Sequence, residues 1–187
     1  MTYHYPIMDL FEERDVFAEV YTELTEGTAP ERIRKIERAY SLSFIGRGTT
    51  RLAFRADTHT GGDPIIVKIA LQGQGGVNAV KRETELWRTA DAAQRNLLAP
   101  VIAADTQHRW LTMPVIDAGV DTTQAHEFHR KLVAAGLAIQ DVTPGDIGVL
   151  DGERKLIDYA NCQKIKQTSV TRTQMKEIVE RRWEQWE

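Results

Sequence analysis

The chain has 187 residues, of which 42% are hydrophobic and 27% charged, and its formal net charge at pH 7 is -3. These values are typical of a globular protein with one sizeable core, and they argue against a general nucleic-acid binder, which needs a surplus of Lys and Arg. The apolar runs are too short to cross a bilayer, and the amino terminus does not have the pattern of a secretory signal. We therefore expect a cytoplasmic protein without a membrane partner.

Two helices are predicted in the first forty residues. Asp9 with Glu12 is typical of a capping box, and apolar residues then recur at helical spacing. Thr28 with Glu31 has the same pattern and predicts the start of a second helix. Residues 1–40 are therefore expected to form a helical extension ahead of the main domain.

From Ser41 onward the pattern is that of a small antiparallel sheet with one helix. Short apolar segments alternate with a glycine-bearing turn and polar loops, as in strands joined by hairpins. A helix is predicted from about residue 78 to residue 93, because Val80, Leu86 and Trp87 mark one apolar face. The predicted strands are 44–45, 52–55, 65–69, 98–104 and 110–115.

The second half of the chain is predicted to be mostly helical, with one hairpin. A helix is expected at about 123–135, and strands at 147–150 and 155–157 are joined by the turn Asp151-Gly152. A final helix is predicted from an apolar stripe formed by Met175, Ile178, Val179, Trp183 and Trp186. The single cysteine, Cys162, is expected to be a small buried side chain. The fold class is therefore α+β.

Three residue groups in the sheet half suggest a phosphate site. Gly46 and Gly48 lie in a predicted hairpin turn, where glycine lets backbone N–H groups approach a ligand. Lys68 lies near the end of a strand and Glu83 in the next helix, and a carboxylate near a lysine favours its charged form. Glu85 is an alternative partner. Taken singly, the glycines are more typical of a plain hairpin, and Lys68 and Glu83 of solvated surface charges.

Three carboxylates in the second half have the spacing of a phosphoryl-transfer site. Asp141 is followed by Pro144 and by Asp146, and Asp158 comes after the predicted hairpin. Carboxylate oxygens are suitable ligands for a small hard cation such as Mg²⁺. Each motif alone is also typical of a surface turn, because Asp, Pro and Gly form turns in any protein.

Taken in order, the motifs from about residue 44 to residue 161 resemble those of the protein-kinase superfamily, in particular its small-molecule phosphotransferases and small atypical kinases. The resemblance implies an N-lobe at 41–116, made of a small antiparallel sheet with one helix. It also implies a reduced, mostly helical C-lobe at 117–161. The remaining residues, 162–187, would be a helix that packs on this domain.

The resemblance also implies roles for the residues of the N-lobe. Gly46 and Gly48 would approach the nucleotide phosphates, Lys68 would contact the α and β phosphates, and Glu83 would orient Lys68. A strand and hinge would hold adenine. In it, Met113 would lie at the back of the pocket, Pro114 would offer its carbonyl and Ile116 its amide.

For the C-lobe, the resemblance implies a catalytic loop and a metal site. Asp141 would accept or orient the proton of a substrate hydroxyl. Asp146 and Asp158 would bind Mg²⁺, or Mn²⁺, bridging the phosphates of ATP.

Several positions depart from the family's pattern. Arg51 stands where a third glycine is usual, and Ile139-Gln140 replaces the His-Arg or His-Gly that precedes the catalytic aspartate. Thr143 replaces a lysine, Asp146 replaces an asparagine, and Ala160 replaces a glycine. The stretch after Asp158 is too short for the usual acceptor platform, which the amino-terminal helices or a partner would have to supply.

Three functions therefore stay open. The first is an ATP- and Mg²⁺-dependent phosphotransferase whose acceptor hydroxyl belongs to a protein or a small molecule. The second is a pseudokinase, a nucleotide-binding or partner-binding module, because a fold alone does not settle function. The third is an interaction protein unrelated to kinases, in which the helix with Trp183 and Trp186 docks on a partner.

Overall fold

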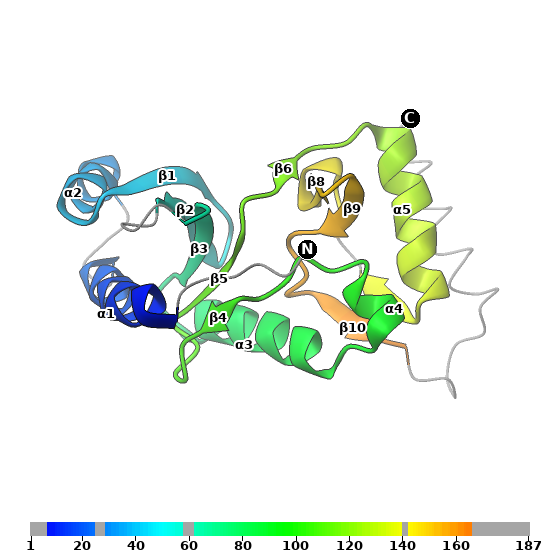
Figure 1. The fold of residues 1–187 in the computed structure, drawn as a ribbon, viewed down its shortest axis with the longest axis horizontal. Helices are drawn as coiled ribbons and strands as arrows, with labels where there is room; N and C mark the ends of the chain where they lie inside the picture. Colours follow the sequence, from blue (N-terminus) through cyan, green and yellow to red (C-terminus); the bar gives the residue numbers. More distant parts are fainter. Residues whose placement is uncertain (1–6, 25–28, 58–61, 140–141, 166–187) are drawn as a thin grey trace. The chain divides into compact units, whose positions relative to one another are not determined.

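The computed structural model describes residues 7–24, 29–57, 62–139 and 142–165 (Figure 1). Its described residues form an α+β fold divided into two compact units. Unit 1 comprises Met1–Thr84 and Pro100–Val115, and unit 2 comprises Glu85–Ala99 and Ile116–Glu187. Among these described residues, no helix has both the length and the apolarity that crossing a membrane requires.

Unit 1 is built around a five-stranded antiparallel sheet in the order β1-β2-β3-β5-β4. The predicted strands are confirmed except at 98–104, where only two residues are extended. Leu98 instead forms an isolated bridge to Leu156 in unit 2. The strands are β1 (Leu42–Arg47), β2 (Arg51–Ala56), β3 (Ile65–Ala70), β4 (Ala103–Ala104) and β5 (Trp110–Pro114).

Two amino-terminal helices pack on this sheet, α1 (Ile7–Leu24) and α2 (Pro30–Tyr40). Phe17 of α1 is buried and meets Trp110 of β5 edge to face, with ring centroids 5.3 Å apart. Ile36 of α2 is buried in the same apolar cluster. The described apolar residues of both helices therefore belong to the core of unit 1.

Both amino-terminal helices form where helical spacing predicts them, but neither has the predicted cap. Asp9 lies within the described part of α1, so it is not the cap of this helix. Helix α2 begins at Pro30 with Ala29 as N-cap, and the predicted cap Thr28 lies outside the described residues. Proline at the first helical position fixes φ near the helical value and has no N–H to leave unpaired.

Helix α3 (Gln74–Thr89) carries Glu83 and begins earlier than its apolar face predicts. Its first turn contains Gly76, where a Cβ atom would lie 2.3 Å from the carbonyl oxygen of Leu71 and 2.8 Å from that of Thr50. Leu71 N–H donates to the same Thr50 oxygen at 2.8 Å. Glycine is therefore required at position 76 because two backbone segments approach each other closely there, and it is part of the helix.

Unit 2 combines short helices with two small sheets, β6-β8-β9 and β10-β7. The predicted helix and hairpin are both present, and Asp151 and Gly152 in the hairpin turn have φ of 52° and 78°, as a type I′ turn requires. The predicted final helix lies outside the described residues. The elements are α4 (Ala92–Arg95), β6 (Asp117–Ala118), α5 (Thr122–Ala134), β7 (Leu137–Ile139), the 3₁₀ helix η1 (Pro144–Asp146), β8 (Ile147–Leu150), β9 (Glu153–Leu156) and β10 (Cys162–Lys164).

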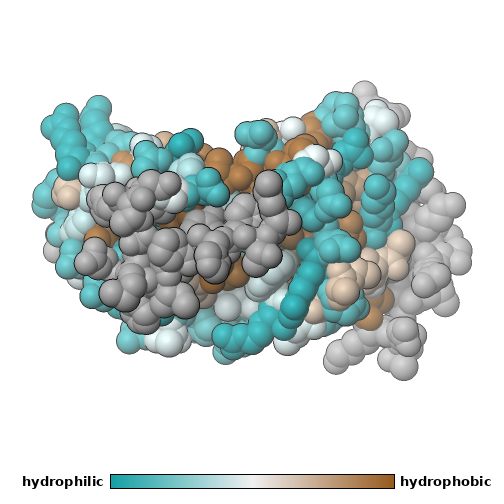
Figure 2. Space-filling model, in the orientation of Figure 1, coloured by the Kyte–Doolittle hydropathy of each residue, from teal (hydrophilic) through white to brown (hydrophobic). Residues whose placement is uncertain are grey.

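The polar and apolar faces of the helices are separated as amphipathic packing requires. In α5, Phe128 and Leu132 are buried while Glu127, Arg130 and Lys131 are exposed. Hydrophilic residues cover the visible faces of α2 and α5 in Figure 2.

Cys162 is buried, as predicted from its isolation in the sequence.

Candidate functional site

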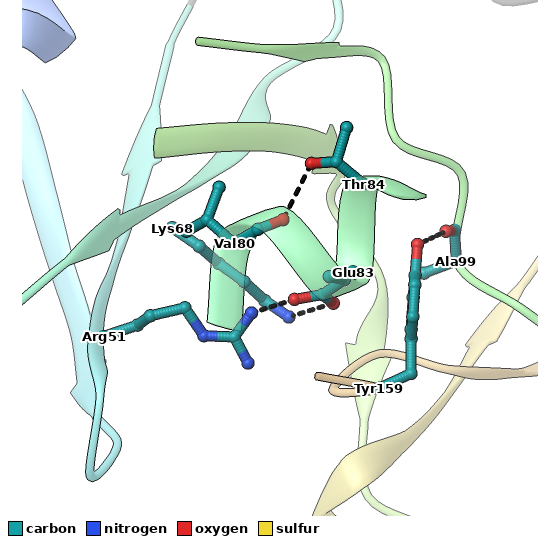
Figure 3. Close-up of polar contacts among 7 residues, drawn as sticks. All are labelled: Arg51, Lys68, Val80, Glu83, Thr84, Ala99 and Tyr159. Carbon is teal, nitrogen blue, oxygen red and sulfur yellow. Dashed lines mark hydrogen bonds and ion pairs between the residues drawn. The ribbon is translucent and has the colours of Figure 1, made fainter. Parts of the chain in front are cut away.

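Lys68 and Glu83 form a buried ion pair inside unit 1 (Figure 3). The Nζ atom of Lys68 on β3 donates to Oε1 of Glu83 on α3 at 2.9 Å, and the side chains are 11% and 0% exposed. Glu85 is exposed on the same helix, so Glu83 is the partner of this lysine. The pair that the sequence analysis placed together is therefore present in the structure.

A second cation, which the sequence analysis missed, shares the carboxylate of Glu83. Nη1 of Arg51, the first residue of β2, donates to Oε2 of Glu83, and the Arg51 side chain is 6% exposed (Figure 3). Ala53, two residues further along β2, is the cross-strand partner of Lys68, so Arg51 and Lys68 are on the same face of the sheet. The alternation of side chains along β2 was the signal that could have indicated this.

The turn between β1 and β2 contains Gly46 and Gly48. Gly48 N–H donates to the carbonyl oxygen of Arg51 at 2.8 Å, which closes the hairpin. Neither glycine is among the residues with positive φ in the described part of the chain. A Cβ atom at Gly46 would meet nothing within 4 Å, and one at Gly48 would meet only the Arg51 oxygen, at 3.6 Å. The packing of the protein itself therefore does not require glycine at either position.

An exposed apolar side chain lies next to this turn. Ile45 on β1 is 55% exposed, and the register between β1 and β2 shifts at this residue, between Phe44 and Gly46. A bulge of this kind redirects one side chain of an edge strand. The sequence analysis assigned Ile45 to a strand but gave it no role.

The predicted adenine-binding segment begins in the last two residues of β5. Met113 is buried and pairs with Ile66 on β3, and Pro114 pairs with Ile65. Ile116, the first residue of the second segment of unit 2, is half-buried. Met113 and Pro114 thus lie at the carboxyl end of a sheet strand, but adenine contacts by these residues stay a prediction.

In unit 2, the β8–β9 hairpin brings the backbones of Asp146 and Asp158 close together. The two strands pair Ile147 with Leu156, and Ile157 N–H donates to the carbonyl oxygen of Asp146 at 2.7 Å. Asp158 is exposed and precedes two buried residues. The predicted metal pair therefore has neighbouring backbone positions at one end of the hairpin.

The carboxylate of Asp146 also stabilises its own turn. Its Oδ2 atom accepts hydrogen bonds from the backbone N–H of Thr143 at 2.7 Å and from the Thr143 hydroxyl at 2.8 Å. Among the described residues, no group of three or more His, Cys, Asp and Glu forms a metal cluster. One oxygen of Asp146 thus already accepts two hydrogen bonds, and Mg²⁺ binding by Asp146 and Asp158 stays a prediction.

The segment after Asp158 is firmly anchored within unit 2. Tyr159 is fully buried, and its hydroxyl donates to the carbonyl oxygen of Ala99 at 2.8 Å (Figure 3). Asp141 lies outside the described residues, while the next residue, Val142, is buried. The convergence of Lys68 with Asp141, Asp146 and Asp158 on one cleft stays a prediction.

No model of a known protein family matches the chain, and no curated protein matches it either.

Proposed function

We propose that the chain is a minimal kinase-like phosphotransferase that uses ATP and Mg²⁺ to phosphorylate a hydroxyl group. The observation that carries this proposal is the buried ion pair between Lys68 and Glu83. Lysine and glutamate side chains are rarely buried in a protein unless their charges are paired. Here a strand and a helix hold the pair together, which supports the role in binding the α and β phosphates that the kinase resemblance implies.

The order of elements in unit 1 supports the same proposal. A glycine-bearing hairpin, a lysine-bearing strand and a glutamate-bearing helix follow one another and are joined to a strand with Met113 near its end. The turn leaves open space at Gly46, so backbone N–H groups there could approach a phosphate without obstruction. Ile45 beside the turn offers apolar surface suited to an adenine ring.

Unit 2 supplies the residues for metal binding and proton transfer in this proposal. Asp146 and Asp158 would hold Mg²⁺, which when bound neutralises charge on the nucleotide phosphates. Asp141 would orient the acceptor hydroxyl and take up its proton. The anchoring of Tyr159 fixes the backbone that presents Asp158.

The experiment compares MgATP binding and ATP turnover, across protein and small-molecule acceptors, in the native chain, Asp158→Ala and Asp141→Ala. We expect turnover to fall at least about 100-fold in both variants, because each loses a group needed in the transition state. Nucleotide affinity should fall mainly in Asp158→Ala, which loses a metal ligand. Asp63→Ala is the matched control, since Asp63 is an exposed aspartate in the loop before β3.

A pseudokinase is the second candidate, and one observation favours it. The Asp146 carboxylate accepts two hydrogen bonds from Thr143, a structural use that competes with metal binding. MgATP binding without turnover in the native chain would select this candidate. If the native chain binds no MgATP, both candidates are wrong.

A further inference from the structure

Unit 2 has a hollow of its own between helix α5 and the hairpin of β8 and β9. Its volume is about 500 Å³. Among the described residues, none of those that the proposed function assigns to nucleotide or metal binding lines it. The side chains that decide its chemistry are those of Asn96, Gln124, Phe128, Lys131, Val149 and Arg154.

One stripe of α5 forms a wall of this hollow. Gln124, Phe128 and Lys131 follow one another at intervals of four and three residues, so they lie on the same face of the helix. Phe128 is buried and gives the wall an apolar base, whereas Lys131 is exposed. The helix thus presents apolar surface and a cation side by side.

The hairpin forms another wall, with an apolar and a cationic side chain. Val149 on β8 is the cross-strand partner of Arg154 on β9, so both side chains are on the same face of the hairpin. Val149 is 37% exposed and is one of two exposed large hydrophobic residues in the part of the chain that the structure describes. It therefore offers apolar surface that the core of unit 2 does not use.

The charges around the hollow leave one cation without a counter-charge. Nη1 of Arg154 lies 3.3 Å from Oε2 of Glu127, and Nζ of Lys155 lies 2.7 Å from Oε2 of Glu153. These two pairs cancel, whereas no described residue forms an ion pair with Lys131. The hollow is therefore complementary to a ligand with one negative charge.

The openness of the hollow suits a peptide segment better than a small molecule. Small-molecule sites usually bury about 70–90% of their ligand. Here Asn96, Lys131 and Val149 are all exposed, so the walls cannot enclose a ligand to that extent. Protein–protein contacts instead combine an apolar centre with a polar rim. The side-chain amide of Asn96 has both a donor and an acceptor, as a peptide group does.

We propose that this hollow is a docking site for a peptide segment of a partner protein, in which an apolar side chain adjoins a carboxylate. The apolar side chain packs on Val149 and Phe128, and the carboxylate pairs with Lys131. The inference goes beyond the proposed function and does not depend on it, because it uses none of the residues that would bind nucleotide or metal.

The test is a titration of the ¹⁵N-labelled chain with blocked hexapeptides, followed by NMR spectroscopy. Gly-Ser-Leu-Glu-Ser-Gly carries both groups, Gly-Ser-Leu-Lys-Ser-Gly reverses the charge, and Gly-Ser-Ser-Glu-Ser-Gly lacks the apolar side chain. We expect the first peptide to bind about 5-fold more tightly than either of the others. It should shift the amide signals of Phe128 and of Gly152, which line the hollow.

Two substitutions at Lys131 test the charge. Lys131→Gln should weaken binding of the glutamate peptide by about 2- to 5-fold, the usual effect of losing an exposed ion pair. Lys131→Glu should reverse the preference, so that the lysine peptide binds more tightly. Arg130→Gln is the matched control, because it removes the same charge from a neighbouring exposed position of α5 that does not line the hollow. Melting temperatures report whether each variant retains the fold.

The remaining outcomes decide against the docking site. Equal affinity for the glutamate and lysine peptides overturns the proposal, and so does equal weakening in Lys131→Gln and Arg130→Gln. Hexanoate is the small-molecule probe. If hexanoate shifts the signals of Phe128 and Gly152 and no peptide does, the hollow binds a small organic acid and the peptide site is wrong. If no probe shifts these signals, the proposal is also wrong.

Discussion

The two units hold their candidate functional residues in different ways. In unit 1, Glu83 is fully buried and is bound by cations from two strands, 15 and 32 residues away in the sequence. In unit 2, the described hydrogen bonds of the Asp146 carboxylate come from Thr143, three residues away. The first arrangement exists only when the unit is folded, whereas the second is a local turn. Substitutions should therefore affect stability much more in unit 1 than in unit 2.

Glu83→Gln should have the largest effect. The amide turns one acceptor oxygen into a donor that faces a cation, and breaking a buried ion pair in this way costs about 3–5 kcal/mol. Urea unfolding of the native chain and the variant measures the loss. Glu85→Gln, the same substitution at an exposed position of α3, should shift the unfolding midpoint far less. Similar midpoints for the two variants would show that the pair in unit 1 does not determine stability.

Gly76→Ala should have the next largest effect. The added Cβ would lie 2.3 Å from the Leu71 carbonyl oxygen, and we expect a loss of about 1–3 kcal/mol from the displaced backbone. Gly75→Ala is the adjacent control, because its Cβ would meet only the Thr50 methyl group, at 3.8 Å. That control should keep or slightly raise the melting temperature, since alanine favours helix. Equal losses in both would contradict the close approach at Gly76.

Asp146→Ala should cost about 1 kcal/mol, the usual effect of losing a side-chain cap. Asp146→Asn retains an acceptor for the Thr143 N–H and should stay close to the native stability. The two variants also separate the local role from the proposed metal role. If Asp146 binds Mg²⁺, the asparagine variant should need more Mg²⁺ for ATP turnover although its thermal stability is native. An Asp146→Ala loss as large as that of Glu83→Gln would refute the contrast between the units.

The ionisation of Cys162 should have the smallest effect on stability near neutral pH, and this effect should grow as the pH rises. Burial raises the pKa of its thiol from 9.0 to about 12. The unfolded chain therefore releases this proton first, so the stabilising contribution is complete below pH 9 and is lost as the pH rises toward 12. Between pH 8 and pH 10, the native chain should lose about 1 kcal/mol more than Cys162→Ala. An equal loss of unfolding free energy in the two proteins between pH 8 and pH 10, measured by urea unfolding, would contradict this.

The longer strands of unit 1 could be predicted from the sequence because their alternation of apolar and polar residues is clear. Leu52 and Phe54 alternate with polar or small residues along β2, and both are buried as that alternation predicts. The ion pair followed from the resemblance of several motifs in order. The role of Arg51 was missed because it depends on cross-strand register, which the sequence does not state.

Other boundaries were missed for local reasons. Gly75 and Gly76 favoured a loop in the sequence, but helix α3 already begins at Gln74. Gly76 is part of its first turn, where a side chain would clash with the Leu71 backbone. The same helix ends at Thr89, and α4 then begins with a new capping box formed by Asp91 and Gln94. The strands β6, β7 and β10 have two or three residues each, too few for a periodic pattern.

The contact of Gly76 with the β1–β2 hairpin has a mechanical consequence. Thr50, at the end of the turn, accepts from Leu71 N–H, and a Cβ atom at Gly76 would lie 2.8 Å from the same Thr50 oxygen, so the turn lies against the start of this helix. Glu83 lies about two turns further along the same helix, at ~3.6 residues per turn. We therefore expect a displacement of the glycine-bearing turn to be transmitted to the helix that carries Glu83.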